Sequence, residues 1–171
     1  LQDDQHANHA IKASFEMLAE TQRINQTFVQ QGLPVAAIGI GINTGEMNVG
    51  DMGSHYRRAY TVIGDAVNLG SRLEGLTKFY GVDILVSETT KDQANNFNFL
   101  TVDKVKVKGK ARPVTIYTPV NPEQKLSDAD VLFNAAMASY FAMHFDGALA
   151  LFKQVGSDFQ FPILLTRYLE R

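Results

Sequence analysis

The sequence contains no cysteine, so neither disulfide bonds nor thiolate metal sites are available to it. No apolar run approaches the roughly 20 residues that cross a bilayer, and no signal peptide opens the chain. The formal net charge of -2 provides no long-range attraction to nucleic acid or to an anionic membrane surface. The four histidines show no spacing typical of zinc ligands. We therefore expect a cytoplasmic globular region that does not bind nucleic acid.

The 171 residues are enough for one domain with a proper core and a small appendage. Pro119 and Pro122 break the preceding pattern, so we expect one domain over residues 1–120 and a helical extension over 121–171. Apolar residues in the extension recur at helical spacing on both sides of a turn at residues 144–147 and resemble one tetratricopeptide-type unit. A single unit cannot bury its own apolar face, so it must pack on the first domain, on a neighbouring segment or on another chain.

Within the first domain, helical and strand-like patterns alternate. Helices are expected over residues 9–31, 65–80 and 88–95. Strands are expected over residues 35–42, 46–49, 60–63, 84–86, 101–108 and 114–120. The glycine-rich stretch 50–58 is expected to form a loop.

Three local signals refine this pattern. The tight-turn sequence Asn43-Thr44-Gly45 predicts that the following strand returns antiparallel to the strand before it. Asp65 occupies the position of a helix N-cap, which explains it better than a metal ligand does. Gly81 is expected to end the same helix, and Ser87 to cap the next one.

Two longer motifs point to a family. They are Ile-Gly-Ile-Gly-Ile-Asn-Thr-Gly at 38–45 and Tyr-Thr-Val-Ile-Gly-Asp-Ala-Val-Asn-Leu-Gly-Ser-Arg-Leu-Glu at 60–74, and Val-Lys-Gly-Lys follows them at 107–110. Together they resemble the signature of class III nucleotidyl cyclase catalytic domains over about residues 9–120. The resemblance implies an α+β fold of the ferredoxin-like nucleotide cyclase type, truncated at its N-terminus, with a mixed and mostly antiparallel sheet. It also implies an adenylate cyclase, a phosphorus–oxygen lyase that converts ATP to 3′,5′-cyclic AMP and pyrophosphate in intracellular signalling.

Asn68 and Arg72 are the expected catalytic residues. They lie four positions apart, so both project from one face of a helix, one turn apart. In the family that the chain resembles, such an asparagine holds the ribose and such an arginine meets the α-phosphate. A fixed guanidinium there stabilises the charge that builds on the phosphoryl oxygens in the transition state. Without the surrounding motif, the pair could also be a solvated helix face.

Thr61 and Lys108 are the expected substrate-binding residues. The resemblance places Thr61 at the purine edge, where adenylate cyclases carry Asp or Thr and guanylate cyclases typically carry Cys. Its hydroxyl can accept a hydrogen bond from an exocyclic amine, which favours adenine. Lys108 is the expected triphosphate contact, with Lys110 as the alternative, because a flexible ammonium suits a phosphate as a point charge. A solvated strand face is the competing interpretation for these lysines.

The resemblance also implies parts that this sequence does not contain. The family uses two divalent ions, Mg²⁺ or Mn²⁺, held by two aspartates in motifs that do not occur in these residues. It builds its active sites across a homodimer, with the metal aspartates from one subunit and the Asn/Arg pair from the other. We therefore expect the chain alone to be inactive. We also expect a longer protein, with the metal segment and a regulatory or membrane domain upstream. The alternatives are a guanylate cyclase, or a non-catalytic cyclase fold used for dimerisation or binding.

Overall fold

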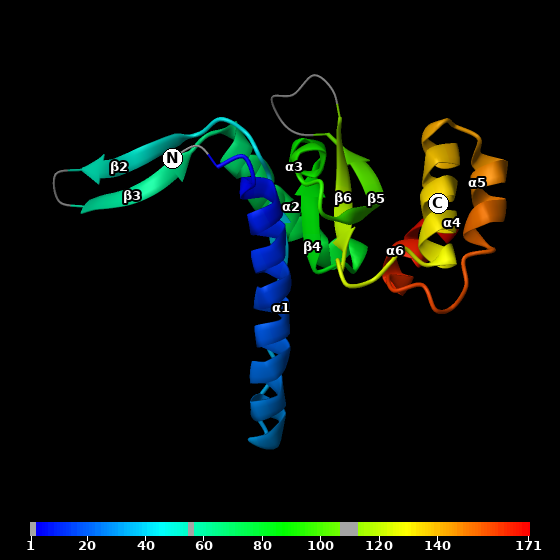
Figure 1. The fold of residues 1–171 in the computed structure, drawn as a ribbon, viewed down its shortest axis with the longest axis horizontal. Helices are drawn as coiled ribbons and strands as arrows, with labels where there is room; N and C mark the ends of the chain where they lie inside the picture. Colours follow the sequence, from blue (N-terminus) through cyan, green and yellow to red (C-terminus); the bar gives the residue numbers. More distant parts are fainter. Residues whose placement is uncertain (1–2, 55–56, 107–112) are drawn as a thin grey trace.

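The computed structural model describes residues 3–54, 57–106 and 113–171 (Figure 1). Over these ranges the elements follow in the order α1 (His6–Gln30), β1 (Ile40–Ile42), β2 (Asn48–Ser54), β3 (Arg57–Ile63), α2 (Asp65–Tyr80), β4 (Ile84–Ser87), α3 (Glu88–Gln93), β5 (Asn98–Val105), β6 (Val114–Val120), α4 (Asp128–Phe141), α5 (Phe145–Phe152) and α6 (Pro162–Leu169). The helices that were expected around 9–31, 65–80 and 88–95 are all present.

The strands form two sheets. Four of them make a mixed sheet in the order β1-β4-β6-β5, in which only β1 and β4 run parallel. β2 and β3 pair antiparallel in a separate hairpin, which projects away from the larger sheet in Figure 1. These pairings confirm a mixed, mostly antiparallel α+β architecture.

The pairing of the hairpin corrects two predictions. The strand that follows Asn43-Thr44-Gly45 does not return to pair with β1, because β2 pairs with β3 instead. The stretch 50–58, which was expected to be a loop, lies largely within β2 and β3. Where the burial of the hairpin is described, at residues 48–51 and 59–63, no side chain is buried in a core, so no alternation of apolar and polar residues is required there. The strand expected over 35–42 is also shorter, and only Ile40–Ile42 is paired.

α1 packs on the sheet through its first half only. Ala7 and Ile11 are buried, in one cluster with Ile84 and Val86 of β4. Farther along the helix, Met17, Ile24 and Val29 are exposed, and Figure 1 shows α1 running well past the sheet. The second half of α1 is therefore largely exposed and does not pack on the sheet.

A β-bulge shapes the second half of β5. The register with β6 shifts between Thr101 and Asp103, which places one extra residue in β5. Val102 and Val105 therefore both contact the main core, although their spacing by three would put them on opposite faces of a regular strand. Asp103, next to the extra residue Val102, is also buried.

The C-terminal helices α4, α5 and α6 pack against the sheet and α2. Phe133, Met137, Phe152 and Leu164 belong to the same buried cluster as Leu73 of α2. Of the three places that the sequence allowed for this helical unit, the structure selects the first domain of the same chain (Figure 1). The turn between α4 and α5 lies at residues 142–144, a little before the expected 144–147, because α5 already begins at Phe145.

Candidate active site

The helix α2 carries the expected catalytic pair. Its N-cap is Gly64, whose carbonyl accepts hydrogen bonds from the backbone N–H groups of Val67 and Asn68 at 3.0 and 3.1 Å. Asp65 is therefore the first residue of the helix and makes no side-chain cap, so the N-cap prediction was wrong by one residue. Its carboxylate still lies in the first turn, where the helix dipole favours a negative charge.

Asn68 and Arg72 both lie on the exposed face of α2, and Leu69 and Leu73 on its buried face. Within the described residues, neither the Asn68 nor the Arg72 side chain hydrogen-bonds to another group. The pair is thus presented to solvent one helical turn apart, as its spacing predicted. Such an arrangement leaves a carboxamide and a guanidinium available to a ligand that approaches this face.

Glycines in β1 and just before it allow α2 to pack directly on the strand backbone. A Cβ on Gly41 would lie 2.2 Å from the carbonyl oxygen of Gly70 and 2.3 Å from the backbone nitrogen of Glu74. A Cβ on Gly39 would lie 2.1 Å from Oγ1 of Thr77. The neighbouring Ile40 and Ile42 point the other way, into the cluster under α1. The alternation of glycine and isoleucine therefore sets the distance of α2 from the sheet.

The turn after β1 holds the start of α2. Nδ2 of Asn43 donates to the carbonyl oxygen of Ala66 at 2.9 Å. Thr89 of α3 donates to Oδ1 of Asn43 at 3.2 Å and to the carbonyl oxygen of Thr44 at 2.9 Å. Sequence reasoning treated Asn43 and the glycines as turn and strand residues and missed this supporting role, although the Asn-Thr-Gly signal marked the position.

Thr61 lies on β3, opposite Gly50 of β2, and it is exposed. It precedes Gly64, where the chain passes from the hairpin into α2, so it belongs to the segment that leads directly to Asn68. The structure therefore leaves Thr61 accessible. It records no hydrogen bond between Thr61 and the catalytic pair within the described ranges.

The predicted phosphate lysines Lys108 and Lys110 lie outside the described residues. Of the lysines before them, Lys104 is exposed and its Nζ lies 4.4 Å from the ring centroid of Phe141 in α4. This cation–π contact directs Lys104 toward the C-terminal helices.

Divalent ions such as Mg²⁺ take oxygen ligands, typically one or two carboxylates together with substrate phosphates and water. Across residues 3–54, 57–106 and 113–171, no group of three or more His, Asp or Glu side chains is placed to hold a metal ion. The described helices also include none that is long and apolar enough to span a membrane.

The site and the fold together define a class of protein. The family profile described as the adenylate and guanylate cyclase catalytic domain matches residues 1–119, and the chain belongs to this family. It is 40% identical over 123 residues to an adenylate cyclase of Anabaena cylindrica, covering 67% of this chain and 24% of that protein. It is 34% identical over 119 residues to adenylate cyclase 1 of Rhizobium meliloti (strain 1021), covering 69% of this chain and 18% of that protein. The chain thus spans about a quarter or less of these curated relatives.

Solved cyclase structures share the fold. The adenylyl cyclase CyaB from P. aeruginosa is similar with a TM-score of 0.63 and 31% identity, over 74% of this chain and 64% of that chain. The guanylyl cyclase Cya2 is similar with a TM-score of 0.63 and 34% identity, over the same shares. These likenesses confirm the predicted ferredoxin-like nucleotide cyclase fold of the class III family.

Proposed function

We propose that the protein containing this chain is an adenylate cyclase that converts ATP to 3′,5′-cyclic AMP and pyrophosphate in the cytoplasm, as part of intracellular signalling. One observation carries the proposal: Asn68 and Arg72 project together from the exposed face of a helix whose other face is buried against the sheet. Two curated adenylate cyclases among the relatives are consistent with this activity.

Arg72 stabilises the transition state of the cyclisation. The ribose 3′-hydroxyl gives up its proton to water, its oxygen attacks the α-phosphorus, the bond from that phosphorus to the bridging oxygen breaks, and pyrophosphate leaves with the bonding electrons. Charge builds on the α-phosphoryl oxygens as phosphorus becomes five-coordinate, and a guanidinium held there binds the transition state more tightly than the ground state. Asn68, one turn earlier, holds the ribose so that the 3′-oxygen stays in line.

Thr61 and Lys108 complete the nucleotide contacts. The Thr61 hydroxyl accepts a hydrogen bond from the exocyclic amine of adenine, and Lys108, or Lys110 in its place, neutralises the triphosphate. The two ions, Mg²⁺ or Mn²⁺, that the family implies are held by carboxylates other than those described here, contributed by the second subunit of a homodimer. The exposure of Asn68, Arg72 and Thr61 supports such a shared site, because all three are open to a partner.

The test measures cyclic AMP formation by the full-length protein with Mn²⁺ and ATP. Arg72→Ala is expected to lower kcat by about 10²- to 10³-fold, the typical effect of removing one group that stabilises a developing oxyanion. Lys78→Ala is the matched control, because Lys78 is an exposed cation on the same helix but on a different face. Its kcat is expected to stay within about twofold of the wild type, as is usual for exposed surface substitutions. Equal kcat values for the two variants would refute the role of Arg72.

The choice of ATP over GTP needs its own experiment, since a guanylyl cyclase is also among the similar structures. Thr61→Ala is expected to reduce the ratio of kcat/KM for ATP to that for GTP by about 2- to 10-fold, the value of one hydrogen bond. A wild-type protein that prefers GTP would identify a guanylate cyclase instead.

The dimer is tested by dilution. If each active site uses two subunits, the specific activity must fall at concentrations where sedimentation shows monomers. Activity per subunit that does not change on dilution into the monomer range would exclude shared sites.

A further inference from the structure

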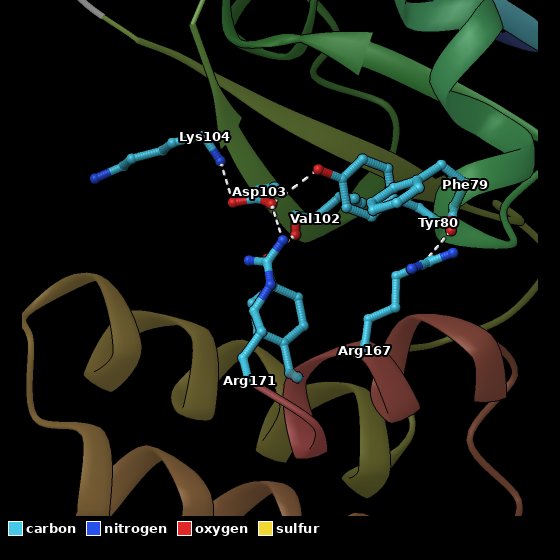
Figure 2. Close-up of polar contacts among 8 residues, drawn as sticks. Phe79, Tyr80, Val102, Asp103, Lys104, Arg167 and Arg171 are labelled. Atoms are coloured by element: carbon cyan, nitrogen blue, oxygen red, sulfur yellow. Dashed lines mark hydrogen bonds and ion pairs between the residues drawn. The ribbon is translucent and has the colours of Figure 1, made fainter.

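A buried carboxylate joins three distant segments where the C-terminal helices meet the sheet and α2 (Figure 2). Asp103 of the β5 bulge is only 12% exposed in its side chain. Its Oδ2 accepts a hydrogen bond at 2.8 Å from the hydroxyl of Tyr80, the last residue of α2. The same oxygen accepts a second at 2.9 Å from Nη2 of Arg171, just beyond α6. The backbone N–H of Lys104 donates to the other oxygen at 2.7 Å.

Two further contacts join α6 to β5 and to α2. The Tyr168 hydroxyl donates to the carbonyl oxygen of Val102 in β5 at 2.6 Å. The Arg167 guanidinium lies 3.6 Å from the ring centroid of Phe79 and donates to the carbonyl oxygen of Phe79 at the end of α2. The last turn of α6 therefore holds the last turn of α2 and the bulge of β5 at the same time, as Figure 2 shows.

The charges in this cluster are matched. Burial, and then the hydrogen bond to Asp103, raise the pKa of the Tyr80 phenol well above its usual range, so the phenol remains a donor at physiological pH. Arg171 supplies the positive charge that balances the carboxylate, and its guanidinium also lies 4.7 Å from the ring centroid of Tyr168. The three donors to Asp103 come from α2, from β5 itself and from the chain end.

We propose that Arg171, through Asp103 and Tyr80, is a positioning residue for the cyclisation that sets the orientation of α2 against β5. This role rests on the proposed function. Arg72 precedes Tyr80 by eight residues, which places it about 12 Å along the helix axis. α2 is a continuous helix, so a tilt at its Tyr80 end is transmitted to Arg72. β5, in turn, leads toward residues 107–110, where the phosphate lysine is expected.

The apolar contacts of α4, α5 and α6 cannot supply this orientation by themselves. Burial of apolar surface is non-directional, so it tolerates small sliding movements of packed helices. A charged hydrogen bond has a narrow range of distances and angles and therefore selects one arrangement. A misplacement of about 1 Å at a reacting group can cost about 10²-fold in rate, so a small tilt of α2 is enough to matter.

The experiment compares three variants of the full-length protein with Mn²⁺ and ATP. Arg171→Ala is expected to lower kcat by about 10-fold or more and to leave KM for ATP within about twofold, because transition-state contacts are lost and ground-state binding is kept. Arg171→Lys restores the charge and is expected to recover part of kcat. Ser127→Ala is the stability control: it removes the side-chain cap of α4, to which Asp130 N–H donates at 3.1 Å, and does not touch the Asp103 cluster. Its Tm falls, but its kcat at a temperature where all variants are folded stays within about twofold of the wild type.

Amide hydrogen exchange provides a readout that does not depend on activity. Arg171→Ala is expected to exchange faster than wild type in the last two turns of α2 and in β5, with α1 unchanged. If the wild type is active, two results would overturn the positioning role alone: equal kcat values for Arg171→Ala and Ser127→Ala, or amide exchange in α2 that Arg171→Ala leaves unchanged. A full-length wild type without cyclase activity would overturn the proposed function and this role together.

Discussion

Gly81 ends α2 under two constraints that can be separated. Its φ is +66°, in the left-handed region, and an added Cβ would lie 2.5 Å from Cβ of Ile163 in α6 and 2.9 Å from Ile163 Cδ1 and Cγ2. The left-handed conformation of a residue with a Cβ costs about 1–2 kcal/mol. Because the nearest atom is the Cβ of Ile163, a change of rotamer does not relieve the clash and α6 must move. Overpacking of this kind costs about 1–3 kcal/mol, so Gly81→Ala should destabilise the fold by about 2–5 kcal/mol.

Gly32 is the matched control, because it has φ +69° and nothing within 4 Å of its added Cβ. It closes α1 with hydrogen bonds from its own N–H to Val29 O at 3.1 Å and from Leu33 N–H to Phe28 O at 2.8 Å. Gly32→Ala should therefore show the conformational cost alone, at most about 1–2 kcal/mol. Urea denaturation followed by far-ultraviolet circular dichroism measures both variants.

A double-mutant cycle then isolates the steric part. Ile163→Gly removes the Cβ that would clash, so the combined Gly81→Ala, Ile163→Gly variant should be more stable than the sum of the single effects by about 1–3 kcal/mol. Ile163→Ala should recover less, since it keeps the Cβ. If Gly81→Ala costs no more than Gly32→Ala and shows no coupling to position 163, the close approach of α6 to the end of α2 is wrong.

Three further changes test the packing around the site. Gly75→Ala should stabilise the protein by about 0.5–1 kcal/mol in urea denaturation, because the added Cβ meets nothing within 4 Å and glycine is entropically costly inside a helix. Gly41→Ala should yield little folded protein in the same assay, because its added Cβ would collide with backbone atoms of α2. Asn134→Ala should lower Tm and cost about 1–3 kcal/mol, because the Asn134 amide bonds the β5 backbone twice, at 2.9 and 3.0 Å. Burial raises the pKa of Tyr80 and Tyr168 above the ordinary 10.0, so these phenols stay protonated in the folded protein when they ionise in the unfolded chain. The stability that they contribute below about pH 10 should therefore be lost as the pH rises further. Urea midpoints at pH 8 and 10.5, with phenolate absorbance as the monitor, check this sign.

The arrangement of positions 68 and 72 could be predicted because their spacing fixes their relative placement on any helix. Positions 68 and 72 share a helix face whatever surrounds the helix, and the buried Leu69 and Leu73 put that face outward. The order of helices and strands followed in the same way from caps, glycine stops and apolar periodicity. The roles of Asn68, Arg72, Thr61 and Lys108 all stay predictions, since they depend on a bound nucleotide.

What the sequence by itself determined were features whose causes lie within a few residues: the span of α2, its end at Gly81, and the Ser87 cap that accepts from Thr90 N–H at 3.3 Å. The tertiary structure alone decided which strands pair, where β5 bulges and what surrounds Asp103. Those outcomes depend on partners that are far apart in the sequence, such as Arg171 and Asp103, which are 68 residues apart. No local sequence pattern can therefore predict them. The physical reason is that backbone conformation and capping are local, whereas the pairing of a strand edge or a buried charge is chosen by competition among all segments that could reach it.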